Sequence, residues 1–182
     1  MEQIKELTKR LIANSFKELL QQMPFEKITI KTVTDHANVI RPTFYNHFHD
    51  KYELVEWIVQ EEILKGAAVR LDAGDGGGAV RTIITGFYED REYYRKAFDI
   101  IGQNGFAETL SELLKKMFED AYSNDKRLED SPVAAGLAAR YYASGIITVI
   151  RYTLFEAGDS SLEEIIDMYT YLMKHTIFEI LN

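Results

Sequence analysis

An eleven-residue stretch, RPTFYNHFHDK, runs from Arg41 to Lys51 and concentrates rings and hydrogen-bond donors in an otherwise acidic chain. Phe44 and Phe48 are four residues apart, so in a helix they lie on one face and can anchor it to a core. The polar side chains then point away from that core, where they can hydrogen-bond to phosphates or base edges. An ordinary helical corner with solvated polar side chains is the alternative. The residues available for such contacts are Arg41, Thr43, Tyr45, Asn46 and His47.

Two short helices position these side chains. The first is predicted over residues 30–37 with Thr29 as its N-cap, and the second over residues 41–47, where Pro42 suits the first turn. Asn38 falls in the turn between them and tolerates the left-handed conformation that ends a helix. This is the layout of a helix-turn-helix, whose second helix must be narrow and polar on its outer face to enter a DNA major groove about 12 Å wide.

The helix ends around this motif add sites for phosphates. Backbone N–H groups at a helix N-terminus attract anions, so Thr29, Lys31 and Thr32 can hold a DNA backbone. Lys51, at the start of the next helix, can supply another phosphate contact. Residues 1–51 carry eight Lys and Arg against six Asp and Glu, whereas the rest of the chain carries thirteen against twenty-three. A basic head joined to an acidic body favours an anionic partner for the head.

The sequence of residues 28–58, ITIKTVTDHANVIRPTFYNHFHDKYELVEWI, resembles the DNA-binding head of the TetR family of bacterial transcriptional regulators. The run TFY-x-HF-x-x-K-x-x-L, which begins at Thr43, is the most specific part of a similarity that covers residues 5–64. The chain departs from the family pattern at two positions. Asn38 stands where the family has glycine, and Ile40 replaces a serine, so it has no side-chain oxygen to cap the second helix.

The resemblance implies roles for individual residues and for the whole protein. Thr43, Asn46 and His47 would face base edges, Tyr45 and Lys51 would hold phosphates, and Arg41 could do either. Members of the family commonly repress by binding a palindromic operator as a dimer, until an effector moves the two heads apart. The residues predicted to contact DNA are Thr29, Lys31, Thr32, Arg41, Pro42, Thr43, Tyr45, Asn46, His47 and Lys51.

Helical periodicity continues along the whole chain, and no segment shows the alternation of a strand. A first helix is predicted over residues 2–22, and Asp50 caps a long helix over residues 51–70. A glycine-rich break at residues 72–78 precedes helices at 79–88, 91–101, 106–122, 132–156 and 161–181. The predicted fold is all-α with about nine helices. A three-helix DNA-binding domain at residues 1–50 precedes an effector-binding and dimerisation domain at residues 51–182, with helix 51–70 connecting them.

The last two predicted helices are the candidates for a dimer interface. The segment at residues 133–150, VAAGLAARYYASGIITVI, is apolar or small nearly all the way round, so we expect it to be buried on several sides. Paired with helix 161–181, helix 132–156 can build a four-helix homodimer interface, as the resemblance implies. A monomer core is the alternative, because buried helices look alike in either setting.

The aromatic residues of the body are the candidates for an effector pocket, which this family usually has. Arg140 and Arg151 lie in otherwise apolar helices, so one of them could meet an anionic ligand, and a salt bridge within the body is the alternative. The aromatic spacing also resembles that of the dihydroxyacetone-kinase operon regulators, a subgroup with members that activate through a protein partner. The predicted pocket residues are Tyr88, Tyr94, Phe98, Phe106, Arg140, Tyr141, Arg151 and Tyr152.

The composition argues against several other classes of protein. The chain has no cysteine, and its four histidines form no grouping with carboxylates, so neither a metal nor a cofactor is predicted. No nucleophile elbow or catalytic grouping appears, which argues against an enzyme. The N-terminus lacks the apolar core of a signal peptide, and the most apolar window is short and interrupted by Arg140. A cytoplasmic protein without a membrane span is therefore expected.

Together with the resemblance, these features predict a DNA-binding regulator that acts as a repressor. It would bind a palindromic operator as a homodimer and be released by an unknown small-molecule effector. The alternative is an activator or a protein-interaction module of the same fold. That protein would work through a protein partner and bind no small molecule.

Overall fold

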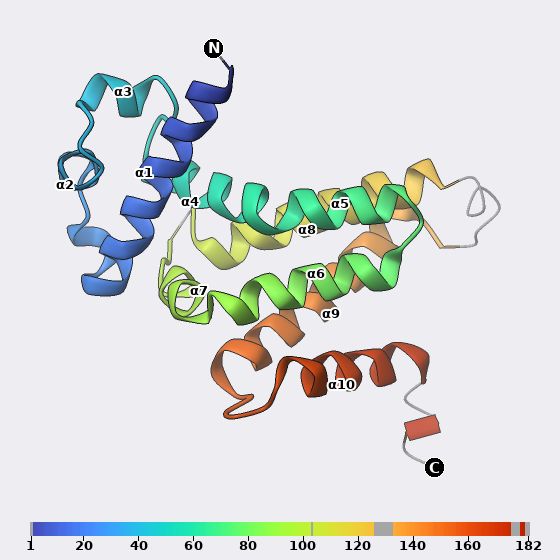
Figure 1. Cartoon of the computed structure of the whole chain (residues 1–182). Helices are drawn as coiled ribbons and strands as arrows, with labels where there is room; N and C mark the ends of the chain where they lie inside the picture. The colour runs from blue at the N-terminus through green and yellow to red at the C-terminus, as the bar shows by residue number, and fades with distance from the viewer. Residues whose placement is uncertain (1, 103, 126–132, 176–178, 181–182) are drawn as a thin grey trace. The chain divides into compact units, whose positions relative to one another are not determined.

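The computed structural model describes residues 2–102, 104–125, 133–175 and 179–180, which form helices and contain no strand (Figure 1). The described part of the chain has nine helices when the continuous helix from Lys51 to Asp72 is counted once, so the predicted all-α class is confirmed. The chain divides into two compact units: a head unit of residues 1–62 and 92–110, and a body unit of residues 63–91 and 111–182. The head unit therefore extends past the predicted boundary at residue 50 and takes in a later segment.

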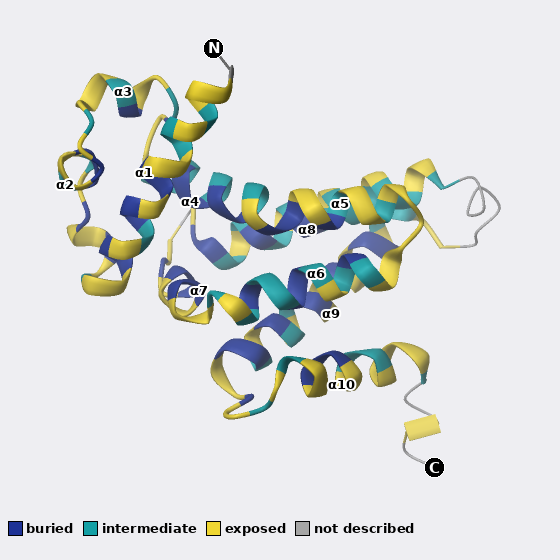
Figure 2. Cartoon of the chain, viewed as in Figure 1, coloured by how far each residue is buried: buried dark blue, intermediate teal, exposed yellow. Residues whose placement is uncertain are grey.

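The head unit forms around apolar side chains from its first helices. Ile12, Phe16, Phe44, Phe48 and Leu54 are all buried. Figure 2 colours the buried residues of these helices dark blue. Helix α1 contacts α2 and α4, and α2 contacts α3, so α2 rests on the first helix and α3 packs against α2. The helices of this unit are α1 (Glu2–Gln22), α2 (Ile30–His36), α3 (Arg41–Tyr45), α4 (Lys51–Val59) and most of α7 (Arg91–Phe98), with a 3-10 turn at Phe25–Lys27.

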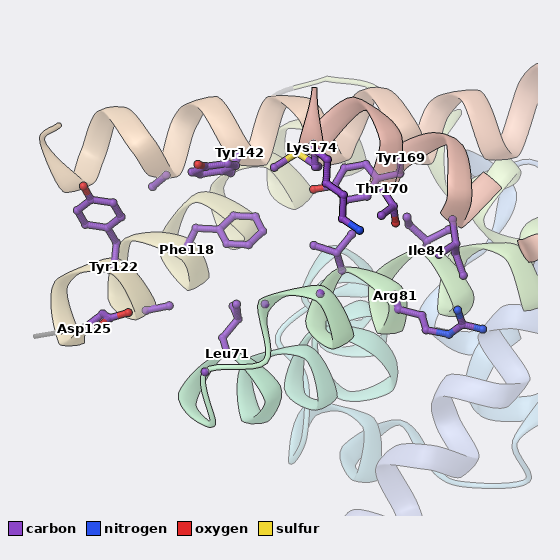
Figure 3. Close-up of a pocket in the computed structure, with 18 residues that line it drawn as sticks. Leu71, Arg81, Ile84, Phe118, Tyr122, Asp125, Tyr142, Tyr169, Thr170 and Lys174 are labelled. Carbon is purple, nitrogen blue, oxygen red and sulfur yellow. The ribbon is translucent and has the colours of Figure 1, made fainter. Parts of the chain in front are cut away.

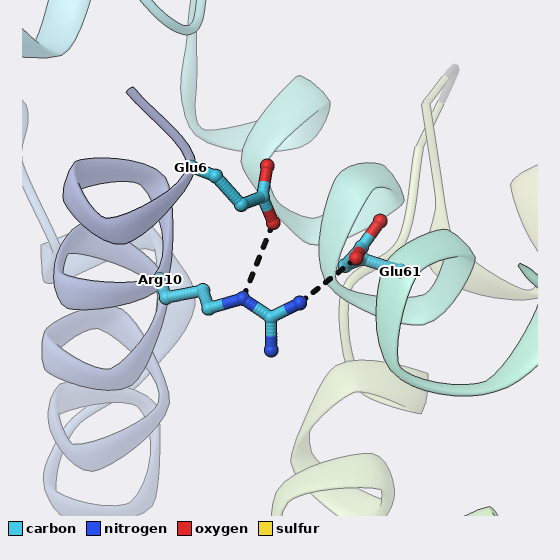
Figure 4. A network of polar contacts seen from close by, with 3 residues as sticks. All are labelled: Glu6, Arg10 and Glu61. Carbon is cyan, nitrogen blue, oxygen red and sulfur yellow. Dashed lines mark hydrogen bonds and ion pairs between the residues drawn. The ribbon is translucent and has the colours of Figure 1, made fainter. Parts of the chain in front are cut away.

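The helix that begins at Lys51 contains a single π-helical turn, η2 (Gln60–Leu64), before it continues as α5 (Lys65–Asp72). Arg10 of α1 pairs with Glu61 of this turn at 2.9 Å and with Glu6 at 3.2 Å (Figure 4). Lys17 pairs with Glu62 at 2.8 Å. Ion pairs at a surface contribute only about 0.2–1 kcal/mol each, so these contacts orient α1 along the turn more than they stabilise the fold.

The body unit is organised around α6 (Gly76–Glu89), which packs against α5, α9 (Ala135–Phe155) and α10 (Leu162–Lys174). The remaining long helix of the chain is α8 (Phe106–Asn124). Ile84 of α6 shares a buried cluster with Ile165 and Ile166 of α10. At Gly86 a Cβ atom would lie 2.6 Å from Cγ1 of Ile63, so only glycine lets α6 approach the end of the π-helical turn this closely.

The helix ends show which local signals decide the boundaries. Ser161 and Glu164 form the predicted capping box at the start of α10. Helix α6 begins at Gly76, three residues before the prediction, because the Asp75 carboxylate accepts the Gly78 N–H at 2.8 Å. Ser131 and Pro132, the predicted start of the next helix, lie outside the described residues, as do 176–178 and 181–182 of the predicted last helix. In the described ranges, no helix is long and apolar enough to cross a membrane.

Candidate nucleic-acid interface and body cavity

Helix α2 starts at the predicted cap. The Thr29 hydroxyl accepts the Thr32 N–H at 3.1 Å and also lies 2.8 Å from the Thr32 hydroxyl. Val33 and Thr34 are buried on the inner side of α2, while Thr29 and Lys31 are exposed. The N-terminus of α2 therefore presents its polar groups on the outside of the head, as a phosphate contact requires.

The turn between α2 and α3 uses the one described non-glycine residue with a left-handed backbone, Asn38, whose φ is 50°. Its conformation lets the Val39 N–H donate to the Thr34 carbonyl at 2.9 Å, which closes the turn. Ile40 then occupies the N-cap of α3 without a side-chain hydrogen bond, as predicted. Pro42 favours the start of the helix in another way, because its ring fixes φ at a helical value. This compensates in part for the missing side-chain hydrogen bond.

Helix α3 buries one aromatic ring and exposes most of its polar groups. Phe44 is fully buried and its ring centroid lies 5.7 Å from that of Phe48. Tyr45 is 57% exposed although it is a large aromatic residue. The rest of the predicted contact set on α3 and its C-terminal turn is exposed or half-buried: Arg41, Pro42, Thr43, Asn46 and His47.

Lys51 is placed differently from the other predicted contact residues. Its ammonium donates to the carbonyl oxygens of Phe25 at 2.6 Å and Ile28 at 3.0 Å, and it lies 3.9 Å from the centroid of the Phe25 ring. Burial lowers its pKa, an effect that Glu26 opposes. Lys51 therefore ties the start of α4 to the 3-10 turn, and one of its three N–H groups is left for a phosphate.

His47 lies in the turn that follows α3, where the charges of two lysines of α1 act on it. Burial lowers its pKa below the usual 6.5, and the charges of Lys9 and Lys5 lower it further. Folding therefore favours the neutral imidazole, and its contribution to stability is present above pH 6.5 and lost as the pH falls through the lowered pKa. At neutral pH the ring carries one N–H donor and one acceptor, both usable at a base edge.

We expect His47 to titrate below pH 6.5 in the free protein when its ring protons are followed by NMR. The variant Lys5→Gln removes one of the two charges without touching the core, so its midpoint should move upward. A midpoint above 6.5 in the unmodified protein would show that the lysines and burial do not control this ring.

The body unit contains a cavity of about 460 Å³ lined by residues of α5, α6, α8, α9 and α10 (Figure 3). Its walls are mostly apolar or aromatic, and Gly74 in the turn before α6 and Gly76 and Gly77 in the first turn of α6 also line it. The polar groups that line it come from Arg81, Tyr122, Asp125, Tyr142, Tyr169, Thr170 and Lys174.

The eight residues predicted for an effector pocket do not line this cavity. Tyr94, Phe98 and Phe106 belong to the head unit, where the Phe106 ring centroid lies 6.0 Å from that of Tyr94 and 5.1 Å from that of Phe98. These three are buried core residues. The structure thus separates them from the other five, which are in the body unit.

The five predicted residues of the body unit are also spread out. Tyr88 and Tyr152 pack against the buried cluster around Ile84, and the Tyr88 hydroxyl donates to the Ser160 carbonyl at 3.3 Å. Arg140, Tyr141 and Arg151 are all exposed. Three aromatic residues that line the cavity, Phe118, Tyr122 and Tyr169, were not predicted from the sequence.

No group of three or more His, Asp or Glu side chains that could hold a metal ion occurs among the described residues. The described residues provide exposed hydrogen-bonding groups on α2 and α3 in the head and a mostly apolar cavity in the body.

Comparison with known proteins finds a family profile that matches each half of the chain. The profile of the bacterial regulatory proteins of the tetR family matches residues 17–58, and the profile of a transcriptional regulator C-terminal region matches residues 78–175. One relative is the HTH-type dhaKLM operon transcriptional activator DhaS of Lactococcus lactis subsp. lactis (strain IL1403). It is 25% identical over 171 residues, which cover 92% of this chain and 89% of the relative.

Solved structures share the same fold. The dihydroxyacetone kinase operon activator DhaS aligns with a TM-score of 0.64 at 20% identity, covering 92% of this chain and 94% of the other. RolR in complex with the ligand resorcinol aligns with a TM-score of 0.56 at 18% identity, covering 94% and 90%. With profiles matching the DNA-binding head and most of the helical body, the chain belongs to the TetR family of bacterial transcriptional regulators.

Proposed function

We propose that this regulator binds a palindromic operator as a homodimer and that a small molecule in the body cavity changes its affinity for DNA. The observation that carries the proposal is α3, where Phe44 is buried while Tyr45 and Asn46 are exposed beside it. A short helix with a buried anchor and a hydrogen-bonding outer face fits a major groove.

The proposed contacts divide into two kinds. Asn46, Thr43 and the neutral His47 would read base edges, and Arg41, next to Pro42 at the start of α3, would contact a base or a phosphate. Tyr45 would bind a phosphate, together with Lys31 and the capping threonines Thr29 and Thr32 of α2. Lys51 would add its one remaining N–H, which makes it a weak test of DNA binding, because its loss also removes two hydrogen bonds within the head.

The homodimer would form through apolar rows on α9 and α10. Leu137 and Tyr141 are exposed one turn apart on α9, and Met168, Tyr171 and Leu172 are exposed on α10. Large apolar side chains gathered on neighbouring helices are characteristic of a surface that another protein covers. A symmetric dimer would present two α3 helices to two half-sites of a palindrome.

The regulator would act as a repressor by occluding a promoter. Activation is the second candidate, favoured by the description of the Lactococcus lactis relative as an operon activator. In vitro transcription from the bound promoter distinguishes the two. A repressor lowers the transcript level when the protein is added, and an activator raises it.

The DNA-binding proposal is tested by fluorescence anisotropy with the DNA upstream of the chain's own gene and with an unrelated fragment. We expect Asn46→Ala to weaken binding to the specific fragment by about 1–3 kcal/mol and to leave the unrelated fragment unaffected. Tyr45→Phe, which removes only a hydroxyl, should weaken binding to both fragments equally. Lys115→Gln, a lysine of α8 in the body unit, is the matched control and should bind as the unmodified protein does. Unchanged binding by both Asn46→Ala and Tyr45→Phe would refute the assignment.

A further inference from the structure

The chemistry of the cavity lining restricts what the body can bind. A volume of about 460 Å³ falls within the range of about 300–1,000 Å³ found for small-molecule sites. Two of its walls are aromatic, since the rings of Phe118 and Tyr142 lie 6.4 Å apart between centroids at an interplanar angle of 56°. Ile84 and Ile166 add aliphatic surface. The walls therefore suit a ligand with a flat, mostly apolar body.

The charges of the lining are not equivalent. Arg81 is held by Glu163, with Nη1 of the arginine 3.1 Å from Oε2 of the carboxylate, so its charge is compensated inside the protein. Asp125 is drawn in Figure 3 at the end of α8, beyond Phe118 as seen from Lys174. The Lys174 side chain extends from α10 over α6, and no carboxylate or carbonyl group of the described residues accepts a hydrogen bond from its ammonium.

An unpaired ammonium beside an apolar cavity discriminates between ligands by charge. Lys174 is an exposed residue, so a neutral ligand leaves water on the ammonium and gains little from it. A carboxylate would replace that water with a charge-assisted hydrogen bond. Burial, and to a lesser extent Tyr142, raises the pKa of Tyr169 to about 12, so this phenol stays a neutral O–H donor at physiological pH and can also serve an anion.

We propose that the cavity binds an aromatic monocarboxylate, with its ring system against Phe118 and Tyr142 and its carboxylate at Lys174. The inference rests on the proposed function only in treating this ligand as the effector. The binding itself involves the body unit and needs no DNA.

The experiment is calorimetric titration of the full chain with two probes of the same shape, 2-naphthoate and its neutral amide, 2-naphthamide. We expect the unmodified protein to bind naphthoate at least tenfold more tightly than naphthamide. Lys174→Gln should weaken naphthoate binding by about tenfold, the scale of a partly exposed hydrogen bond between charged groups, and leave naphthamide binding unchanged. Equal binding of the two probes, no binding of either, or discrimination that survives in Lys174→Gln would overturn the proposal.

Two further variants locate the effect. Lys115→Gln changes the net charge of the protein by the same amount as Lys174→Gln, but Lys115 does not line the cavity. This variant should therefore keep the tenfold preference for naphthoate. Thr170→Phe adds an aromatic ring to the cavity lining, so it should weaken the binding of naphthoate and of naphthamide to the same extent. If Lys115→Gln loses discrimination as Lys174→Gln does, the preference reflects net charge and the proposed site is wrong.

The same samples separate this inference from the proposed function. DNA binding in the absence of probe depends on the head, and naphthoate binding depends on the body. A chain that binds naphthoate at Lys174 but no operator would refute the regulator and keep the site, whereas operator binding without discrimination between probes would refute only the site.

Discussion

Replacing Phe44 by alanine is expected to destabilise the head by about 3–5 kcal/mol and to abolish DNA binding. The side chain is fully buried, and it packs between Tyr45 and Phe48 with ring centroids 5.6 and 5.7 Å away. Its removal leaves a cavity beneath a helix only five residues long, which has little stability of its own. Because small domains are stable by only about 5–15 kcal/mol, a loss of this size removes a large part of the stability of the head.

The chain carries its own reporter for this experiment. Trp57 is the single tryptophan, and its ring centroid lies 5.7 Å from that of Phe48. Tryptophan fluorescence in urea therefore follows the head, and for slopes of about 1–3 kcal/mol per molar urea the midpoint should fall by about 2 M.

Tyr45→Ala is the matched control for Phe44→Ala. Tyr45 is adjacent in sequence but exposed, so we expect its removal to change stability by less than about 0.5 kcal/mol while still weakening DNA binding. A Phe44→Ala protein whose tryptophan transition matches that of the unmodified chain would contradict the packing role. Loss of DNA binding with an unchanged transition would place Phe44 in the contact surface instead.

The head could be predicted closely because its boundaries are set by local chemistry. Thr29, Asn38 and Asp50 each satisfy or redirect backbone groups a few residues away, and the structure places all three as predicted. The absence of a cap at Ile40 could be predicted for the same reason. What periodicity could not show is which apolar residues of α1 are buried. Ile4, Leu7 and Leu11 recur at helical spacing, yet all three are exposed.

The cavity could not be predicted because an aromatic residue looks the same in a core and in a pocket wall. Tyr94 and Phe106 pack together in the head core, whereas Tyr142 and Phe118 line a cavity in the body, and no local signal separates the pairs. The π-helical turn at Gln60–Leu64 was also missed, since its sequence fits an ordinary helix. One of its residues, Ile63, packs against Gly86, a neighbour that is distant in sequence.

Charged substitutions in the exposed apolar side chains of α9 and α10 are expected to disrupt the proposed dimer. The double variant Leu137→Glu, Leu172→Glu is expected to convert the proposed dimer into a monomer of 21.0 kDa, measured by size exclusion with light scattering. Both leucines are more than half exposed in the single chain, so the charges should cost the monomer less than about 0.5 kcal/mol each. In a dimer interface the same charges would be buried without partners, which is strongly unfavourable.

Loss of the dimer should also weaken operator binding by about 10²–10⁴-fold, because the second head no longer binds as part of the same molecule. Val69→Glu is the matched control, since Val69 is an equally exposed apolar residue of the body unit but lies on α5. We expect that variant to stay dimeric and to bind the operator normally. A double variant that keeps the dimer mass, or a Val69→Glu protein that loses it, would place the interface elsewhere. An unmodified chain that is monomeric even on DNA would exclude the dimer, and α3 would then read a single half-site.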